Sequence, residues 1–119
     1  MDPHFDGVIF QTHAAELQRR LRRQHPPLVV LDTRAAAERA RGVLPGSVAL
    51  RSSDLAALPA GTGPATEFVV VGRDQYDEEA RRTTLRLRAL GARRIVELTG
   101  GMFEWESQGF PLAPAVQAA

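Results

Sequence analysis

Short apolar runs alternate along most of this chain with segments that have helical spacing. Five runs predict strands: Val8–Phe10, Leu28–Leu31, Val48–Leu50, Phe68–Val71 and Ile95–Leu98. Two of them, 28–31 and 68–71, are uninterrupted apolar runs of four residues, which is typical of strands covered on both faces of a sheet. The segments between the runs predict helices over residues 13–23, 35–41, 53–58, 77–90 and 102–108.

Local signals set the ends of these predicted helices. Thr12 and Ser53 are expected to cap the helices that follow them, and Asp77 is expected to cap the helix of residues 77–90. The acids that follow Asp77 suit the positive end of the helix dipole. Gly91 stands where a glycine commonly ends a helix.

Strands that alternate with helices predict an α/β fold with three layers. We expect a mostly parallel five-stranded sheet with helices on both faces. Ligands of such folds bind beyond the carboxyl ends of the strands. Two loops lie there in this chain, Asp32–Arg34 and the segment 72–77.

Length, residue composition and net charge limit the number of domains and the kinds of partner that this chain is expected to have. The 119 residues predict one domain (1–119), with a core over about 8–112 and a flexible tail at 113–119. There is no cysteine, and the net charge of +1 favours neither nucleic acid nor membrane as a partner. All 15 basic residues are arginine, as in a GC-rich bacterial genome. Without a membrane span or signal peptide, we expect a cytoplasmic protein.

Two stretches together resemble the rhodanese-like domains, a family of sulfurtransferases. The stretch LVVLDTRAAAERARGVLPGSVAL has a buried strand, Asp-x-Arg, a short helix with an acid, and a Pro-Gly turn. The stretch EFVVVGRDQYDEEARRTTLRLRALGARRIVELTGGMFEWESQGFPL has a strand, a loop, a helix ending in Leu-x-x-x-Gly, a strand, Gly-Gly, a tryptophan and Gly-x-Pro. The resemblance covers about residues 8–112 and implies the family's fold.

The family's catalytic residue has no counterpart here. Its enzymes form a persulfide on a cysteine directly after the strand that ends here at Val71, and that position holds Gly72. Backbone N–H groups of the loop and the next helix start cradle the charged sulfur in the family. Gly72 could also adopt a φ above zero. Val43 departs from the family too, since a histidine is common there.

The loop is acidic where the family binds an anion. Asp74 and Asp77 lie in or beside the cradle, and Asp77 is placed to accept the N–H groups itself. Arg73 supplies one opposing charge. The loop residues Gly72, Arg73, Asp74, Gln75, Tyr76 and Asp77, together with Arg34, form the candidate binding set. Tyr76 is either an exposed contact for a partner or a packed anchor of the loop.

Other matching residues have structural interpretations. Asp32 and Arg34 either border the pocket or form an ion pair that fixes the turn after the strand. Glu38 matches the family's helix acid and can pair with a nearby arginine, and Trp105 is expected in the core. Gly100 and Gly101 are expected to serve backbone shape.

No cofactor or metal is expected. His4, His13 and His25 lack metal-ligand spacing to one another or to carboxylates. The sequence thus favours a rhodanese-homology domain without catalytic activity, which binds a protein or peptide through loop 72–77. The alternative is an enzyme that uses carboxylate-assisted chemistry, or binds a small anion, on the same loop.

Overall fold

Five parallel strands form the sheet in the computed structural model, which describes residues 8–23 and 27–115. The strands are β1 (Gln11–Thr12), β2 (Leu28–Asp32), β3 (Val48–Ala49), β4 (Glu67–Val71) and β5 (Arg94–Leu98). Their spatial order is β1-β5-β4-β2-β3, and every neighbouring pair is parallel. The predicted α/β fold with a five-stranded parallel sheet is confirmed.

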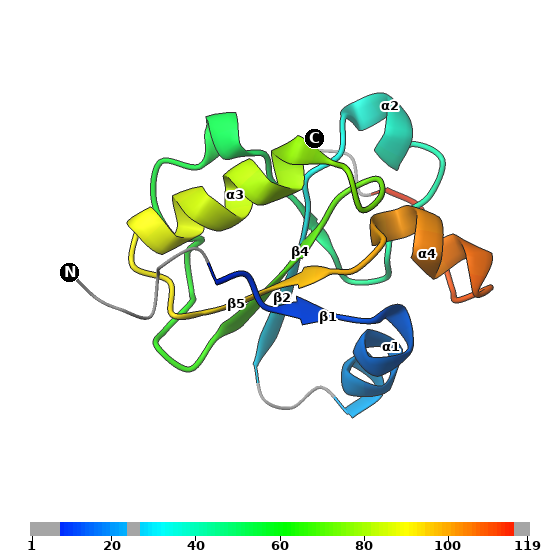
Figure 1. Ribbon diagram of the computed structural model, residues 1–119, viewed down its shortest axis with the longest axis horizontal. Coiled ribbons are helices and arrows are strands. Elements are labelled where there is room, and N and C mark those ends of the chain that lie inside the picture. The colour runs from blue at the N-terminus through cyan, green and yellow to red at the C-terminus, as the bar shows by residue number, and fades with distance from the viewer. Residues whose placement is uncertain (1–7, 24–26, 116–119) are drawn as a thin grey trace.

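Helices cover both faces of this sheet (Figure 1). They are α1 (Ala14–Arg23), α2 (Ala36–Arg39), α3 (Glu78–Ala89) and α4 (Gly101–Ser107), and a short 3₁₀ helix, η2, spans Ser52–Asp54. Figure 1 shows α3 on one side of the sheet and α1 with α4 on the other. Among the described residues, no helix is long and apolar enough to cross a membrane.

Alternate residues of the central strands supply two separate cores. Val69 and Val71 of β4 join the core under α1 and α4, which includes Leu17 and Trp105. Their neighbours in the same strand point to the other face. There Phe68 and Val70 pack with Leu31 and Leu87 of the α3 side. The uninterrupted apolar runs reflect this burial on both faces.

The first strand lies later than the sequence predicts. The apolar run Val8–Phe10 is not a strand, and Phe10 is 59% exposed. Pairing with β5 instead begins where the Glu97 N–H donates to the Phe10 carbonyl, and the strand spans Gln11–Thr12. Thr12 therefore belongs to β1, and α1 begins at Ala14. Register with a distant strand, which a local run does not encode, sets this boundary.

The short helices also differ from their predicted bounds. The helix predicted at 35–41 is the single turn α2, and the one predicted at 53–58 is only η2. Ser53 is not a cap, since η2 starts after Arg51 without a side-chain hydrogen bond. Turns this short gain little from helical propensity, so tertiary contacts set their lengths.

The segment predicted as a tail begins with an ordered residue. Val43 and Ala113 exchange two backbone hydrogen bonds of 2.8 Å and form an isolated antiparallel bridge. Val43, which replaces the histidine common in the family, is buried. Residues 116–119 of the predicted tail lie outside the described residues, as do His4 and His25.

Candidate functional site

Loop 72–77 leaves the carboxyl end of β4 and leads directly into α3. Its first two carbonyls face the start of α4: the Met102 N–H donates to the Gly72 oxygen and the Phe103 N–H to the Arg73 oxygen, both at 2.9 Å. Two of the N–H groups that a helix start leaves unpaired are thereby satisfied. These backbone hydrogen bonds from α4 fix the first part of the loop and do not depend on its side chains.

Gly101 makes this close approach possible. Its φ is +56°, and a Cβ there would lie 2.5 Å from the Gly72 carbonyl oxygen and 2.8 Å from the Asp74 nitrogen. Gly100 also has a positive φ, of +75°. Only glycine adopts such a backbone at little cost and leaves room for the loop. Gly101 is the spacer between α4 and the candidate loop, whereas a Cβ on Gly100 would meet the Glu104 side chain.

The anion cradle is filled by the chain's own carboxylate. The Asp77 Oδ2 accepts a hydrogen bond of 2.8 Å from the Arg73 N–H, and its Oδ1 accepts one of 2.9 Å from the Glu79 N–H. The Asp77 side chain is 4% exposed. Asp77 is therefore the N-cap of α3, as predicted. Its two oxygens occupy two of the backbone donors that an anionic ligand would use.

Gly72 is required because Asp77 leaves no space. A Cβ on Gly72 would lie 2.8 Å from the Asp77 Oδ2, 2.9 Å from its Cβ and 3.0 Å from the Ala80 Cβ. The expected positive φ is wrong, since Gly72 is not among the glycines with φ above zero. The constraint at this position is steric and comes from a side chain five residues further along.

Arg73 is the basic residue of the loop and is half exposed. Its Nε lies 3.4 Å from the Asp77 Oδ2 and 3.9 Å from the Glu38 Oε2 of α2. Glu38 also accepts a 3.2 Å hydrogen bond from the Ala35 N–H. Glu38 thus has an arginine nearby, as the sequence suggested. At 55% exposure, Arg73 contributes little stability through these pairs.

The Asp32–Arg34 loop contains a buried ion pair. The Arg34 Nη2 lies 2.8 Å from the Asp32 Oδ2, and the Arg34 Nε lies 3.0 Å from the Oδ1. Arg34 also donates to the Gly42 and Glu38 carbonyls, at 2.9 and 3.4 Å. The side chains are 6% and 1% exposed. Of the two interpretations from the sequence, this geometry matches the pair that fixes the turn, although Arg34 still borders two cavities.

The tip of loop 72–77 projects into solvent. Asp74, Gln75 and Tyr76 are exposed, and the Tyr76 side chain is 79% exposed. The Tyr76 N–H donates to the Asp74 Oδ1 at 2.9 Å, which closes a tight turn of the Asx type. Tyr76 is therefore not a packed anchor, and its ring is available for contacts.

A second exposed aromatic ring, which the sequence interpretation missed, lies beside the loop. Phe103 is 70% exposed, and its N–H is the one that binds the Arg73 carbonyl. The spacing of apolar residues in α4 could have predicted that Phe103 is exposed. Met102 and Trp105 lie three apart on the buried face, so Phe103 must point elsewhere. Trp105 is fully buried, and its indole N–H donates to the Pro111 carbonyl at 2.8 Å.

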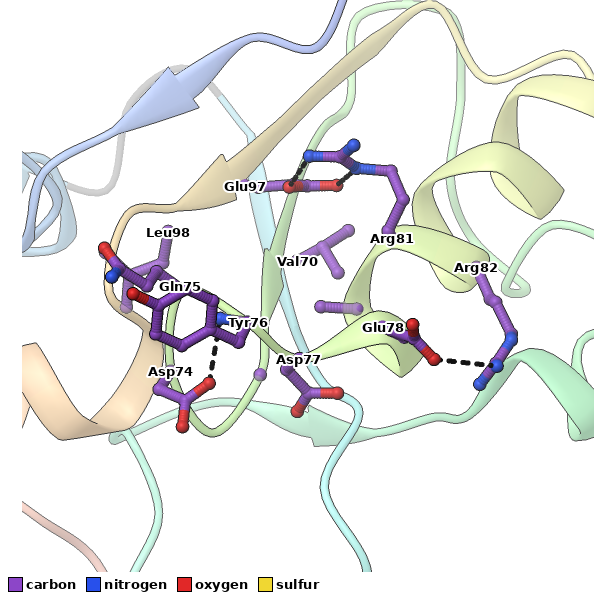
Figure 2. A pocket seen from close by; sticks show the side chains of 12 residues that line it. Val70, Asp74, Gln75, Tyr76, Asp77, Glu78, Arg81, Arg82, Glu97 and Leu98 are labelled. Atoms are coloured by element: carbon purple, nitrogen blue, oxygen red, sulfur yellow. Dashed lines mark hydrogen bonds and ion pairs between the residues drawn. The ribbon is translucent and has the colours of Figure 1, made fainter.

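Three cavities surround the loop, with volumes of about 380, 270 and 420 Å³. The first lies between the loop, the start of α3 and the end of β5 (Figure 2). The second lies on the Phe103 side, and the third lies between the loop and the Thr33–Ala35 segment. Within the described residues, no group of three histidine or carboxylate side chains could hold a metal ion. His13, directly before α1, is far from this set of residues in sequence and lines none of these cavities.

Comparison with known structures reveals similar folds. A protein from Bacillus halodurans has a TM-score of 0.81 and 15% identity, over 93% of this chain and 81% of the other. The rhodanese-like domain of an Anabaena protein has a TM-score of 0.75 and 25% identity, over 91% and 81% of the two chains. A thiosulfate sulfurtransferase from Pseudomonas aeruginosa has a TM-score of 0.75 and 23% identity, over 91% of this chain but 20% of its own.

Comparison with protein families is more specific. A search of curated proteins found no match. The family model described as "Rhodanese-like domain" matches residues 13–108, which is most of the chain and includes both candidate loops. The match agrees with the two motif stretches, with the five-stranded parallel sheet and with the position of the loop after β4. The chain belongs to the rhodanese-like domain family, and it has no cysteine.

Proposed function

We propose that this protein is a rhodanese-like domain without sulfurtransferase activity, which binds a protein or peptide partner through the face around loop 72–77. One observation carries the proposal: the Asp77 carboxylate accepts hydrogen bonds from two backbone N–H groups of the anion cradle, those of Arg73 and Glu79. A persulfide carrier requires a thiolate, and this chain has no cysteine to provide one. The site lacks the nucleophile, and the Asp77 carboxylate takes two of the backbone donors that an anionic substrate would use.

The surface around the filled cradle supports a binding role. Tyr76 at the tip of the loop and Phe103 beside the loop are large, exposed aromatic side chains. Aromatic residues and arginine are the side chains that dominate binding energy at protein interfaces. The backbone bonds from α4 and the Asx turn at Asp74 hold the loop in one shape. The loop would therefore lose little conformational entropy when a partner binds.

The carboxylate chemistry that the sequence left open has less support. Both oxygens of Asp77 already accept backbone hydrogen bonds, and the side chain is buried. Oxygens that are engaged in this way have fewer lone pairs available to attack a substrate. Asp74 accepts one backbone hydrogen bond and lies at the exposed tip of the loop, where water surrounds its carboxylate.

Two measurements test the proposed function. Sulfite release from thiosulfate in the presence of cyanide should not exceed a protein-free blank, and turnover above the blank would refute the inactive state. Affinity capture from a lysate should enrich a protein with wild type but not with Tyr76→Ala/Phe103→Ala. Leu85→Ala is the matched control, because Leu85 is 52% exposed on α3 and lines none of the three cavities. Equal enrichment with the double variant and the control would contradict binding through this face.

A further inference from the structure

The cavity of about 380 Å³ has the build of a small binding pocket. Its volume falls within the range of ligand sites, roughly 300–1,000 Å³. Val70, Ala80 and Leu98 supply apolar walls, and Gln75 and Tyr76 border it from the loop tip. Figure 2 shows Tyr76 and Gln75 grouped with Asp74, away from the charged pairs of α3 and β5. A ligand here would contact an aromatic ring, an apolar wall and polar groups together.

This cavity differs from its two neighbours in charge. It is lined by the four carboxylates of Asp74, Asp77, Glu78 and Glu97, but by only two guanidinium groups, those of Arg81 and Arg82. The cavity on the Phe103 side is lined by three carboxylates and three guanidinium groups, and the third cavity by four of each. Of the three cavities, only this one, of about 380 Å³, is lined by more carboxylates than guanidinium groups.

Most of these carboxylates already have partners. Glu97 accepts two hydrogen bonds from Arg81, at 2.9 and 3.2 Å, and this hydrogen bonding raises the pKa of Arg81. Glu78 pairs with Arg82 at 3.3 Å. Asp77 is held by backbone N–H groups. The carboxylate of Asp74 is different: within the described part of the chain it forms no ion pair, and the one hydrogen bond that it accepts comes from the Tyr76 N–H.

The chemistry of the missing partner follows from this arrangement. A cation between Asp74 and the exposed Tyr76 ring would gain an ion pair and a cation–π contact at once. The lining carboxylates do not form a metal-binding group in the described residues, which disfavours a divalent ion. A planar guanidinium satisfies both contacts better than an ammonium, because it stacks on a ring and binds a carboxylate through two N–H groups. The apolar wall suits the methylene stem behind such a group.

We propose that this pocket receives an arginine side chain from a peptide segment of the partner, held between Asp74 and Tyr76. The inference rests on the proposed function, since it names the chemistry of the partner that the loop face binds. The occupant is a basic peptide rather than a free cation, because the flanking walls and the exposed Phe103 extend the contact surface beyond one side chain.

An NMR titration of the isotope-labelled protein tests this. The probe is acetyl-Gly-Leu-Arg-Leu-Gly-amide, and the matched control has citrulline, which keeps the shape but not the charge, in place of arginine. The arginine peptide should cause saturable shifts at the amides of residues 74–78. The citrulline peptide should bind more weakly by a factor of about five or greater. Binding should weaken as salt rises from about 50 to about 300 mM.

Variants sharpen the titration. Asp74→Asn keeps the oxygen that accepts the Tyr76 N–H but removes the charge, and Tyr76→Leu removes the ring. Each should weaken binding of the arginine peptide by about threefold to fivefold. Asp54→Asn is the matched control, because Asp54 is exposed on η2 and lines none of the three cavities, and it should leave the affinity unchanged.

Three results would overturn the inference. They are equal binding of the citrulline peptide, shifts confined to the Phe103 side, and binding of arginine amide as tight as that of the peptide, which would indicate a small cation. None of them bears on the capture experiment. Partner enrichment that depends on Tyr76 and Phe103 but not on Leu85 would keep the binding role while the arginine pocket failed.

Discussion

Two loops begin side by side at the carboxyl ends of neighbouring strands. Each contains a buried carboxylate, and the two carboxylates have different partners. Asp32 of β2 pairs in register with Val71 of β4, so the Asp32–Arg34 loop and loop 72–77 start at the same level of the sheet. In the first loop the carboxylate of Asp32 is neutralised by a guanidinium two residues away. In the second loop the carboxylate of Asp77 is held by backbone N–H groups.

The difference separates a fully buried turn from a loop whose tip is exposed. The pair in the first loop is sealed from solvent, and Arg34 reaches onward to carbonyls of the next turn. In the second loop the carboxylate is buried at the base, so the three residues of the tip remain exposed. The Asp77 side chain caps α3 and also accepts hydrogen bonds from two backbone N–H groups that an anionic ligand of the loop would otherwise find free. The exposed part of the loop is its outer surface, through which we propose that a partner binds.

The largest effect is expected from the first loop. Asp32→Ala and Arg34→Ala each leave an uncompensated buried charge, so each should lower the free energy of unfolding by about 3–5 kcal/mol. Denaturant unfolding of each variant measures this. The exposed pair Arg82–Glu78, with side chains 62% and 82% exposed, is the control, and Glu78→Ala should cost less than about 1 kcal/mol. Similar losses in both pairs would show that burial does not distinguish them.

A smaller effect is expected where a thiol is returned to the second loop. Gly72→Cys places atoms against Asp77 and Ala80, and should lower the free energy of unfolding by about 1–3 kcal/mol. Nearby carboxylates also oppose a thiolate, so this variant should not take up sulfur from thiosulfate. Gly72→Cys/Asp77→Gly removes the obstruction and should form a persulfide with release of sulfite. Intact mass after thiosulfate treatment separates the two variants.

The control for that experiment is Asp77→Gly alone, which has no thiol and must gain no sulfur. Persulfide formation by Gly72→Cys as readily as by the double variant would mean that the Asp77 carboxylate is no barrier. The comparison between the loops would then lose its functional consequence, because the cradle would accept an anion with Asp77 in place.

The smallest effect contrasts the base and tip of the second loop. Asp77→Ala removes the cap of α3 and should lower the free energy of unfolding by about 1–2 kcal/mol. Asp74→Ala at the exposed tip should change it by less than about 0.5 kcal/mol. Thermal or denaturant unfolding of both variants measures this difference. If Asp74→Ala were the more destabilising change, the tip would be part of the fold rather than a free surface.

Local sequence signals determined much of this protein. The apolar runs at β2, β4 and β5 and the periodicity of α1 and α3 placed the sheet and the main helices, because those elements are long enough for their patterns to be unambiguous. Asp77 was identifiable as a cap since capping depends on a few consecutive residues. The missing cysteine and the Gly72 in its place were also legible in the sequence.

Tertiary contacts decided the rest. Only the packing of α3 against the loop shows that Asp77 excludes any Cβ at Gly72, and only the approach of α4 explains Gly101. The short elements β1, α2 and η2 shifted from their predicted bounds because pairing with distant strands and turns sets them. The exposure of Tyr76 and Phe103, and the unpaired charge of Asp74, depend on which side chains the fold brings beside them. Local patterns encode elements, whereas the surface around the loop arises where segments far apart in sequence meet.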